Sequence, residues 1–268
     1  MVASSAIVKD TAKTALKPNY LKSVIGSTVV VFSSIICYLL SKLLGTVFGR
    51  VAYYTVLALF ILFILIPLFY GLIRFFRRMQ WGQNDGVISI FYYFSSKHSY
   101  LRVIKLNVII ALRLLVIGLV LMIPAVITDV LQNGHLYDLF GITMPLWTSN
   151  LWIVSEVLKV SALIVLFFVS LRFYIAPFLF VADDGIDVLE ALHFSTVISK
   201  RTAFDFFFLI ISFALWILLS ILLMPLCFIL PYFIMSYLVH CRFAVAQYNR
   251  VVDEISGNNS APYYSADI

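Results

Sequence analysis

The sequence predicts an all-α polytopic membrane protein, in which a six-helix transmembrane bundle is accompanied by amphipathic interfacial helices. Three observations support this fold class. Of the 268 residues, 63% are hydrophobic and only 12% are charged, whereas a soluble domain is about half apolar and about a quarter charged. The mean hydropathy is +1.03. Six runs are also long and apolar enough to cross a bilayer, which takes about 20 residues. Lipid is therefore the expected surroundings of most of the chain.

The predicted spans follow one another closely along the chain, at residues 24–44, 51–73, 106–128, 151–175, 206–223 and 226–245. Only Met224 and Pro225 separate the last two, which predicts a tight helical hairpin. The first run is longer than the apolar core of a signal peptide, so we expect a true span. Residues 1–252 are thus predicted to form a single six-span domain, and the polar tail 253–268 is predicted to be disordered.

The distribution of lysine and arginine predicts that both termini face the cytoplasm. With the N-terminus inside, fifteen basic residues fall on the inner side, whereas the outer side holds only Lys42 and Arg50. Basic residues favour the cytoplasmic side of short loops. We therefore expect a multi-pass protein of the cytoplasmic membrane, whose basic inner face attracts the anionic headgroups of membrane lipids.

Residues 5–17 are predicted to form an amphipathic helix on the membrane surface before the first span. One face is apolar, and a neighbouring stripe is basic with a spacing of four residues. The apolar face comprises Val8, Ala12, Ala15 and Leu16, and the stripe comprises Lys9, Lys13 and Lys17. The aromatic stretch GVISIFYYFSSKHSY at 86–100, with basic residues on both sides, is likewise expected in the inner headgroup region.

The segment FVADDGIDVLEALHFSTVISKR at 180–201 joins the fourth and fifth spans and holds the densest group of acids. Asp183, Asp184 and Gly185 are typical of a turn. Asp187 is a good N-cap, with Glu190 three residues on as in a capping box. Lys200 and Arg201 would suit a helix C-terminus. These residues predict a cytoplasmic helix at about 187–201, in which most charges serve capping.

A binding role for the same segment is the alternative. Glu190 and His193 form Glu-x-x-His, which places both side chains on one helical face, but di-iron bundles use this pair twice and the chain has no second copy. Asp183 and Asp184 could hold a cation or a basic partner. Asp183, Asp184, Glu190 and His193 are therefore a candidate cytoplasmic interaction site.

Three ionisable residues lie within predicted spans: Arg113, Glu156 and Lys159. Each is costly at mid-membrane, by about 2.5–3.5 kcal/mol. Glu156 and Lys159 stand three residues apart on one face, so one interpretation is a neutralised ion pair beside an arginine that extends towards the headgroups. The other is a polar path for a solute, built from all three residues.

The sequence carries no recognisable catalytic or cofactor-binding motif. It contains no GxSxG, HExxH, P-loop or GxGxxG pattern, and its polar loops are too short for a catalytic domain. The three cysteines lie in apolar runs without a CxxC pair, so neither a disulfide framework nor a metal site is expected. We expect no cofactor. The net charge of +6 could suggest nucleic acid, but the basic residues flank apolar runs, so no nucleic-acid partner is expected.

The C-terminal half resembles a family of bacterial integral membrane proteins catalogued as "domain of unknown function 975". The resemblance is carried by FYIAPFLFVADDGIDVLEALHFSTVISKRTAFDFFFLIISFALWILL and LPYFIMSYLVHCRFAVAQY, and by AKTALKPNYLKSV before the first span. It implies a multi-span protein of the bacterial cell membrane with no agreed activity. One departure is LLMPLCFIL, which lacks the glycine expected in the turn before the last span.

Two functions remain open on the sequence alone. The first is a non-enzymatic envelope protein that interacts with lipids, with another membrane protein or with a second copy of itself. The alternative is a small solute or ion transporter or channel that uses Arg113, Glu156 and Lys159.

Overall fold

The structure is a computed structural model that describes residues 5–83, 85–132, 151–183, 185–219 and 224–256. Within these ranges the chain forms α-helices, short 3₁₀ segments, one π-helical segment and turns, and no β-strand, so the predicted all-α class is confirmed. Several of the helices are long and apolar enough to cross a membrane, as expected of a polytopic protein.

The membrane-spanning candidates of the described residues number five: Ser5–Phe48, Arg50–Gln80, Lys97–Gln132, Leu151–Ala182 and Cys227–Val252. They include the first four predicted spans and, from Cys227 onwards, the sixth. The predicted span at 206–223 is not among them. Residues 206–219 of that span are helical, and residues 220–223 lie outside the described part of the chain.

The chain divides into two compact units. One unit contains Met1–Asn107 and Tyr174–Ile268, and the other contains Val108–Phe173. Each is described by itself below.

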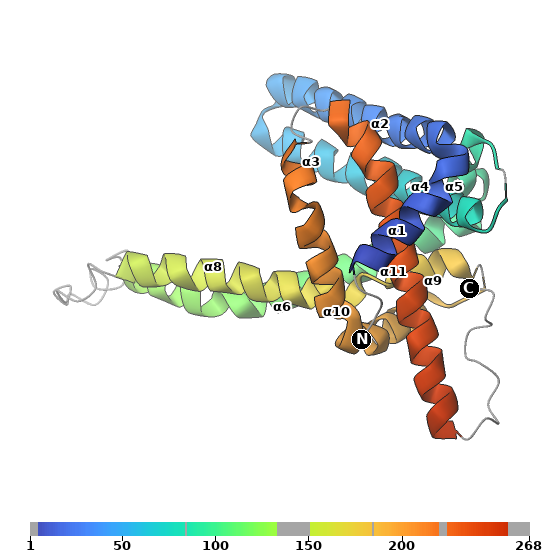
Figure 1. The fold of residues 1–268 in the computed structure, drawn as a ribbon. Helices are drawn as coiled ribbons and strands as arrows, with labels where there is room; N and C mark the ends of the chain where they lie inside the picture. The colour runs from blue at the N-terminus through green and yellow to red at the C-terminus, as the bar shows by residue number, and fades with distance from the viewer. Residues whose placement is uncertain (1–4, 84, 133–150, 184, 220–223, 257–268) are drawn as a thin grey trace, which may run out of the picture. The chain divides into compact units, whose positions relative to one another are not determined.

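The first unit begins with two long antiparallel helical segments. Helix α1 (Ser5–Leu16) continues through a 3₁₀ turn at Lys17–Asn19 into α2 (Tyr20–Phe48), and a return segment follows. Gly49, with a φ of +89°, makes the turn, because this backbone conformation strains other residues. The return segment comprises α3 (Arg50–Phe60), a π-helical segment (Ile61–Leu65) and α4 (Ile66–Gln80), and it lies alongside α2 (Figure 1).

The predicted N-terminal helix is confirmed, and its apolar face is buried within the unit. Val8 and Ala12 are 0% exposed, and Leu16 is also buried. These residues pack against α11 (Met224–Ser256), with further contact to α10 (Val188–Leu219). Protein rather than lipid therefore covers the apolar face, because α11 offers a complementary apolar surface.

The aromatic segment after α4 packs against α4 within the same unit. It forms a 3₁₀ helix, η3 (Val87–Phe91), and a short helix, α5 (Tyr92–Ser95), both in contact with α4. Ile90 and Tyr93 are buried. Gly71 permits this contact, since a Cβ atom there would stand only 1.7 Å from the Ile90 carbonyl oxygen.

The C-terminal part of the first unit comprises α9 (Ala176–Ala182), α10 and α11. The predicted helix at 187–201 does not end at Arg201. It continues as α10 to Leu219, because no glycine or proline interrupts residues 188–219. The predicted tail likewise begins too early, since α11 extends to Ser256. The rest of the tail, 257–268, lies outside the described residues.

The second unit is an antiparallel pair of helices (Figure 1). It contains α6 (Lys97–Gln132) from Val108 onwards, α8 (Leu151–Ser170) and a 3₁₀ turn at Leu171–Phe173. Gly118 of α6 faces Leu166 of α8, which its Cβ would meet at 3.5 Å. The predicted outer loop lies outside the described residues from 133 to 150.

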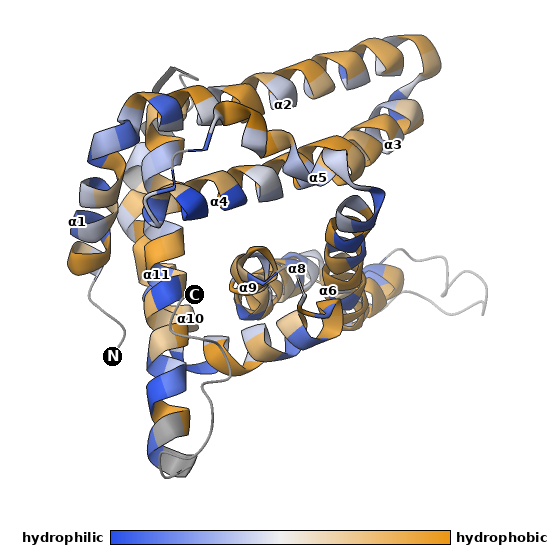
Figure 2. Ribbon diagram, turned by 90° about the vertical axis from the view of Figure 1, so that its right-hand side faces the viewer, coloured by the Kyte–Doolittle hydropathy of each residue, from blue (hydrophilic) through white to orange (hydrophobic). Residues whose placement is uncertain are grey.

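Large hydrophobic side chains project from the helices of the second unit. Leu112 and Leu119 of α6 are 60% and 63% exposed, and Val157 of α8 is 61% exposed. Figure 2 shows hydrophobic residues along α6 and α8, and also over α2 and α3 of the first unit. Apolar side chains exposed along whole helices are suited to contact with lipid, where helices satisfy their own backbone hydrogen bonds.

The contact between Gly71 and Ile90 leads to a first prediction. A Gly71→Ala variant should lose about 1–3 kcal/mol of stability, because the new methyl group overlaps the Ile90 backbone and forces η3 away from α4. The measurement is unfolding of the purified protein by titration with sodium dodecyl sulfate in mixed micelles, followed by circular dichroism.

Gly118→Ala is the matched control, because its methyl group would make only ordinary contact with Leu166. This variant should be as stable as the parent or gain up to about 1 kcal/mol from better helix propensity. If both alanine variants unfold like the parent, the close approach of η3 to α4 does not exist.

Candidate functional site

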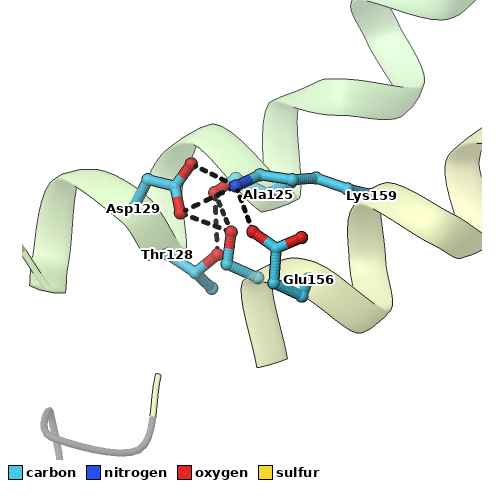
Figure 3. A network of polar contacts seen from close by, with 6 residues as sticks. Ala125, Thr128, Asp129, Glu156 and Lys159 are labelled. Atoms are coloured by element: carbon cyan, nitrogen blue, oxygen red, sulfur yellow. Dashed lines mark hydrogen bonds and ion pairs between the residues drawn. The ribbon is translucent and has the colours of Figure 1, made fainter. Parts of the chain in front are cut away.

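An ion-pair cluster joins α6 and α8 in the second unit (Figure 3). Lys159 Nζ lies 3.0 Å from Asp129 Oδ2 and 3.0 Å from Glu156 Oε1. The predicted pair of Glu156 and Lys159 is therefore confirmed, and Asp129 is an additional partner from the facing helix. Two carboxylates and one ammonium leave the cluster with a formal charge of −1.

Ser155 ties the cluster to the contact between the helices. Its hydroxyl is buried and donates to Asp129 Oδ1. The same hydroxyl oxygen also lies 3.4 Å from the Ala125 carbonyl oxygen. With Asp129 accepting from both Ser155 and Lys159, the two helices are joined at one level by charge-assisted hydrogen bonds. The arrangement is that of a clamp between antiparallel helices.

Arg113 does not join this cluster. It is exposed on α6, sixteen residues before Asp129. At a rise of 1.5 Å per residue that separation is about 24 Å along the helix. The structure therefore brings together two of the three residues of the predicted polar path and leaves Arg113 apart.

A double-mutant cycle tests the clamp. Asp129→Asn and Lys159→Met should each destabilise the protein, and their effects should be coupled, though weakly because both side chains are more than a third exposed. Unfolding in mixed micelles gives the four stabilities required.

Glu156→Gln is the control for this cycle, since the Glu156 side chain is 62% exposed and its ion pair with Lys159 lies within α8. Its coupling with Lys159→Met should be smaller than that of Asp129. Zero coupling between Asp129 and Lys159 would show that the helices are not held together by this pair.

The acidic segment between α9 and α10 has the structural roles that its pattern predicts. The Gly185 backbone N–H donates to Asp183 Oδ1 at 2.7 Å, which closes a turn. The Leu189 N–H donates to Asp187 Oδ2 at 3.3 Å, so the predicted N-cap is confirmed. Asp184 lies outside the described residues. Nothing in these contacts distinguishes Asp183 from a turn residue.

Glu190 and His193 are exposed on the first turns of α10. Within the described ranges, no group of three His, Cys, Asp or Glu side chains is placed to hold a metal ion. Arg102, at the start of α6, contacts the turn before α10. Its guanidinium donates to the Ile186 carbonyl and stands over the Phe180 ring at 5.0 Å. An arginine thus holds the turn in place, a contact that the spacing of the acids did not indicate.

A buried polar network joins α10 and α11 to the segment before α9. Tyr174 Oη lies 2.7 Å from Thr202 Oγ1 and 3.1 Å from His240 Nε2. The Tyr237 hydroxyl donates to the Tyr174 carbonyl at 2.6 Å, and the Tyr174 ring stacks on Phe206 at 4.1 Å. Because these groups are buried and satisfy one another, we assign the network to packing.

A cavity of about 350 Å³ at the end of α4 gathers three arginines. We call it the arginine pocket, and it is lined by Arg74, Arg77, Arg78, Trp81, Gln83, Val181 and Ala182. The arginines stand at positions i, i+3 and i+4 of α4, so they share one helical face. The sequence pattern predicts only that these arginines lie on the inner side, because their contact with α9 depends on the fold.

Each arginine of the pocket has a contact that fixes its position. The Arg74 guanidinium stands 3.6 Å over the Tyr92 ring, Arg77 Nη1 donates to the Val181 carbonyl at 2.9 Å, and Arg78 pairs with Asp85 at 2.6 Å. Tyr92 itself is positioned by the packing of η3 against Gly71. The pocket is therefore held from three sides: by the aromatic segment, by α9 and by the loop after α4.

A fourth arginine lies beside the pocket. Arg242 of α11 stands over the Trp81 ring at 5.2 Å, within the range of a cation–π contact. Four guanidinium groups thus lie at or beside one cavity. Guanidinium groups form paired hydrogen bonds to carboxylate and phosphate oxygens, so the arrangement is suited to binding an anion.

Comparison of the chain with protein families, curated proteins and solved structures finds no match.

Proposed function

We propose that this chain is a non-enzymatic integral protein of the bacterial cytoplasmic membrane that binds anionic lipid headgroups through the arginine pocket. The family resemblance of the C-terminal half supports the bacterial membrane location, and the bias of lysine and arginine supports cytoplasmic termini. The helices that are long and apolar enough to span a membrane support the multi-pass arrangement.

The observation that carries the proposal is the gathering of Arg74, Arg77 and Arg78 around one cavity. Asp85 pairs with Arg78 at 2.6 Å, and three guanidinium groups gather at this one cavity. A phosphate group can accept several hydrogen bonds from neighbouring guanidinium groups at once. Such a site favours a phosphate over a carboxylate of similar size.

The position of the pocket favours lipid as the source of that phosphate. The arginines end a helix that is apolar enough to span a membrane, and they belong to the predicted inner side. Basic residues just beyond a span lie at the depth of the headgroups, and basic pockets on this side bind lipid phosphates. Trp81 fits this position, because tryptophan is enriched at the depth of the headgroups.

Substitution of the pocket arginines tests the proposal. Phosphatidylglycerol nanodiscs should raise the Tm of the protein above its value in phosphatidylcholine nanodiscs. In an Arg74→Gln/Arg78→Gln variant this difference should shrink, because each arginine near the anionic surface contributes about 1 kcal/mol. Thermal unfolding in the two kinds of nanodisc is the measurement.

Lys97→Gln/Arg250→Gln is the matched control, since it removes the same charge from two exposed positions outside the pocket. It should keep the lipid-dependent difference in Tm. Equal losses in the two double variants would mean that overall charge, not the pocket, responds to the lipid. No difference in Tm in the parent protein would refute headgroup binding altogether.

A further inference from the structure

A second cavity, of about 600 Å³, lies between α1, α10 and α11 in the first unit. We call it the lysine groove. One wall is basic and consists of Lys9, Lys13 and Lys17. The facing wall is apolar and includes Phe213 and Trp216 of α10 and Phe228 and Ile229 of α11. The volume falls in the range of about 300–1,000 Å³ typical of small-molecule sites.

The two walls are joined at the Lys9 end of the groove. Lys9 Nζ donates to the Ser212 carbonyl at 3.2 Å and stands 4.5 Å over the Phe213 ring. Tyr232 of α11 donates from its hydroxyl to the Lys9 carbonyl at 3.4 Å. Lys9 is thus a structural residue that fixes α1 against both helices, and the groove keeps its shape through these contacts.

Lys13 and Lys17 supply the charge that the groove presents. Both are exposed, and they follow Lys9 at intervals of four residues, so the ammonium groups form one row. Within the described part of the chain, neither forms an ion pair with an acidic side chain at 4 Å or less. In α1 and the 3₁₀ turn that follows it, Asp10 is the acid, and the three lysines leave a net charge of +2.

The opposite wall is open to an apolar ligand. Trp216 and Phe228 are 54% and 53% exposed, although both are large hydrophobic residues. A soluble anion would contact the lysines and make no use of this wall. A neutral acyl chain would contact the wall and make no use of the lysines. A ligand that contacts both has an anionic head and a hydrocarbon chain.

We propose that the lysine groove binds an acyl-chain amphiphile with an anionic head, its head at Lys13 and Lys17 and its chain against Trp216 and Phe228. A fatty acid and an anionic phospholipid share this chemistry. The site is separate from the arginine pocket: the residues that line the two cavities do not overlap. Either site can therefore fail its test without the other.

Photocrosslinking tests the groove. The protein is placed in phosphatidylcholine nanodiscs that contain a trace of a probe with a diazirine in its acyl chain. The three arms use a phosphatidylglycerol probe, a phosphatidylcholine probe and a palmitic acid probe. Crosslinked peptides around Phe213–Trp216 and Phe228–Tyr232 are quantified by mass spectrometry. We expect at least about fivefold more labelling there by one or both anionic probes than by the phosphatidylcholine probe.

Charge variants decide whether the lysines select the head. In Lys13→Gln/Lys17→Gln, labelling by the anionic probes should fall to the level of the phosphatidylcholine probe, whereas Lys13→Arg/Lys17→Arg should keep the anionic preference. Lys97→Gln/Lys105→Gln removes the same charge from exposed positions outside the groove and should also keep it.

The three arms separate the outcomes. Preference for palmitic acid alone identifies a fatty-acid site, and preference for phosphatidylglycerol alone identifies an anionic phospholipid site. Preference for both anionic probes identifies a site that accepts either head. Equal labelling by all three probes would show that ordinary surrounding lipid fills the groove and would overturn the proposal. The proposal would also be overturned if Lys13→Gln/Lys17→Gln kept the anionic preference as its control does, while both variants elute as monodisperse protein.

Discussion

Basic side chains outnumber acidic ones by 19 to 13 in a chain that is 63% hydrophobic, and the rest of the structure depends on how these charges are balanced. A cation among apolar helices is stable only where a counter-charge or water reaches it. Lys159 obtains two carboxylates from the chain itself, and Arg78 obtains Asp85. The arginine pocket and the lysine groove gather further cations, and we propose that anions from the surroundings contribute to their balance.

The difference between a structural charge and a binding charge follows from the geometry around it. Lys159 pairs with Asp129 and Glu156, and the contact with Asp129 joins α6 to α8, so its charge serves the clamp. The pocket arginines are fixed from outside the cavity: Arg74 by the Tyr92 ring and Arg77 by the Val181 carbonyl. The close approach of Ile90 to Gly71 places Tyr92 where it can support Arg74. A backbone contact between apolar residues thereby shapes the arginine pocket.

Local patterns in the sequence were sufficient for the helices, the Asp187 cap and the pair of Glu156 and Lys159, because each depends on residues a few positions apart. Contacts between distant segments were not accessible in this way. Asp129 reaches Lys159 across thirty residues, and α1 packs on α11 from the other end of the chain. The basic stripe of α1 was visible, but the apolar wall that turns it into a groove belongs to α10 and α11. Helix α10 continues beyond Arg201 because neither glycine nor proline interrupts it.

The most direct test of whether surrounding lipids supply the anions is to identify the lipids that stay bound to the protein. These are the lipids that remain after gentle extraction from its own membrane. Native mass spectrometry of the extracted protein, compared with the lipid composition of the same membrane, measures their selection. Bound lipids should be enriched in anionic species, and the enrichment should decrease as salt weakens the electrostatic attraction. Bound lipids in the same proportions as the membrane, at low and high salt alike, would contradict this account.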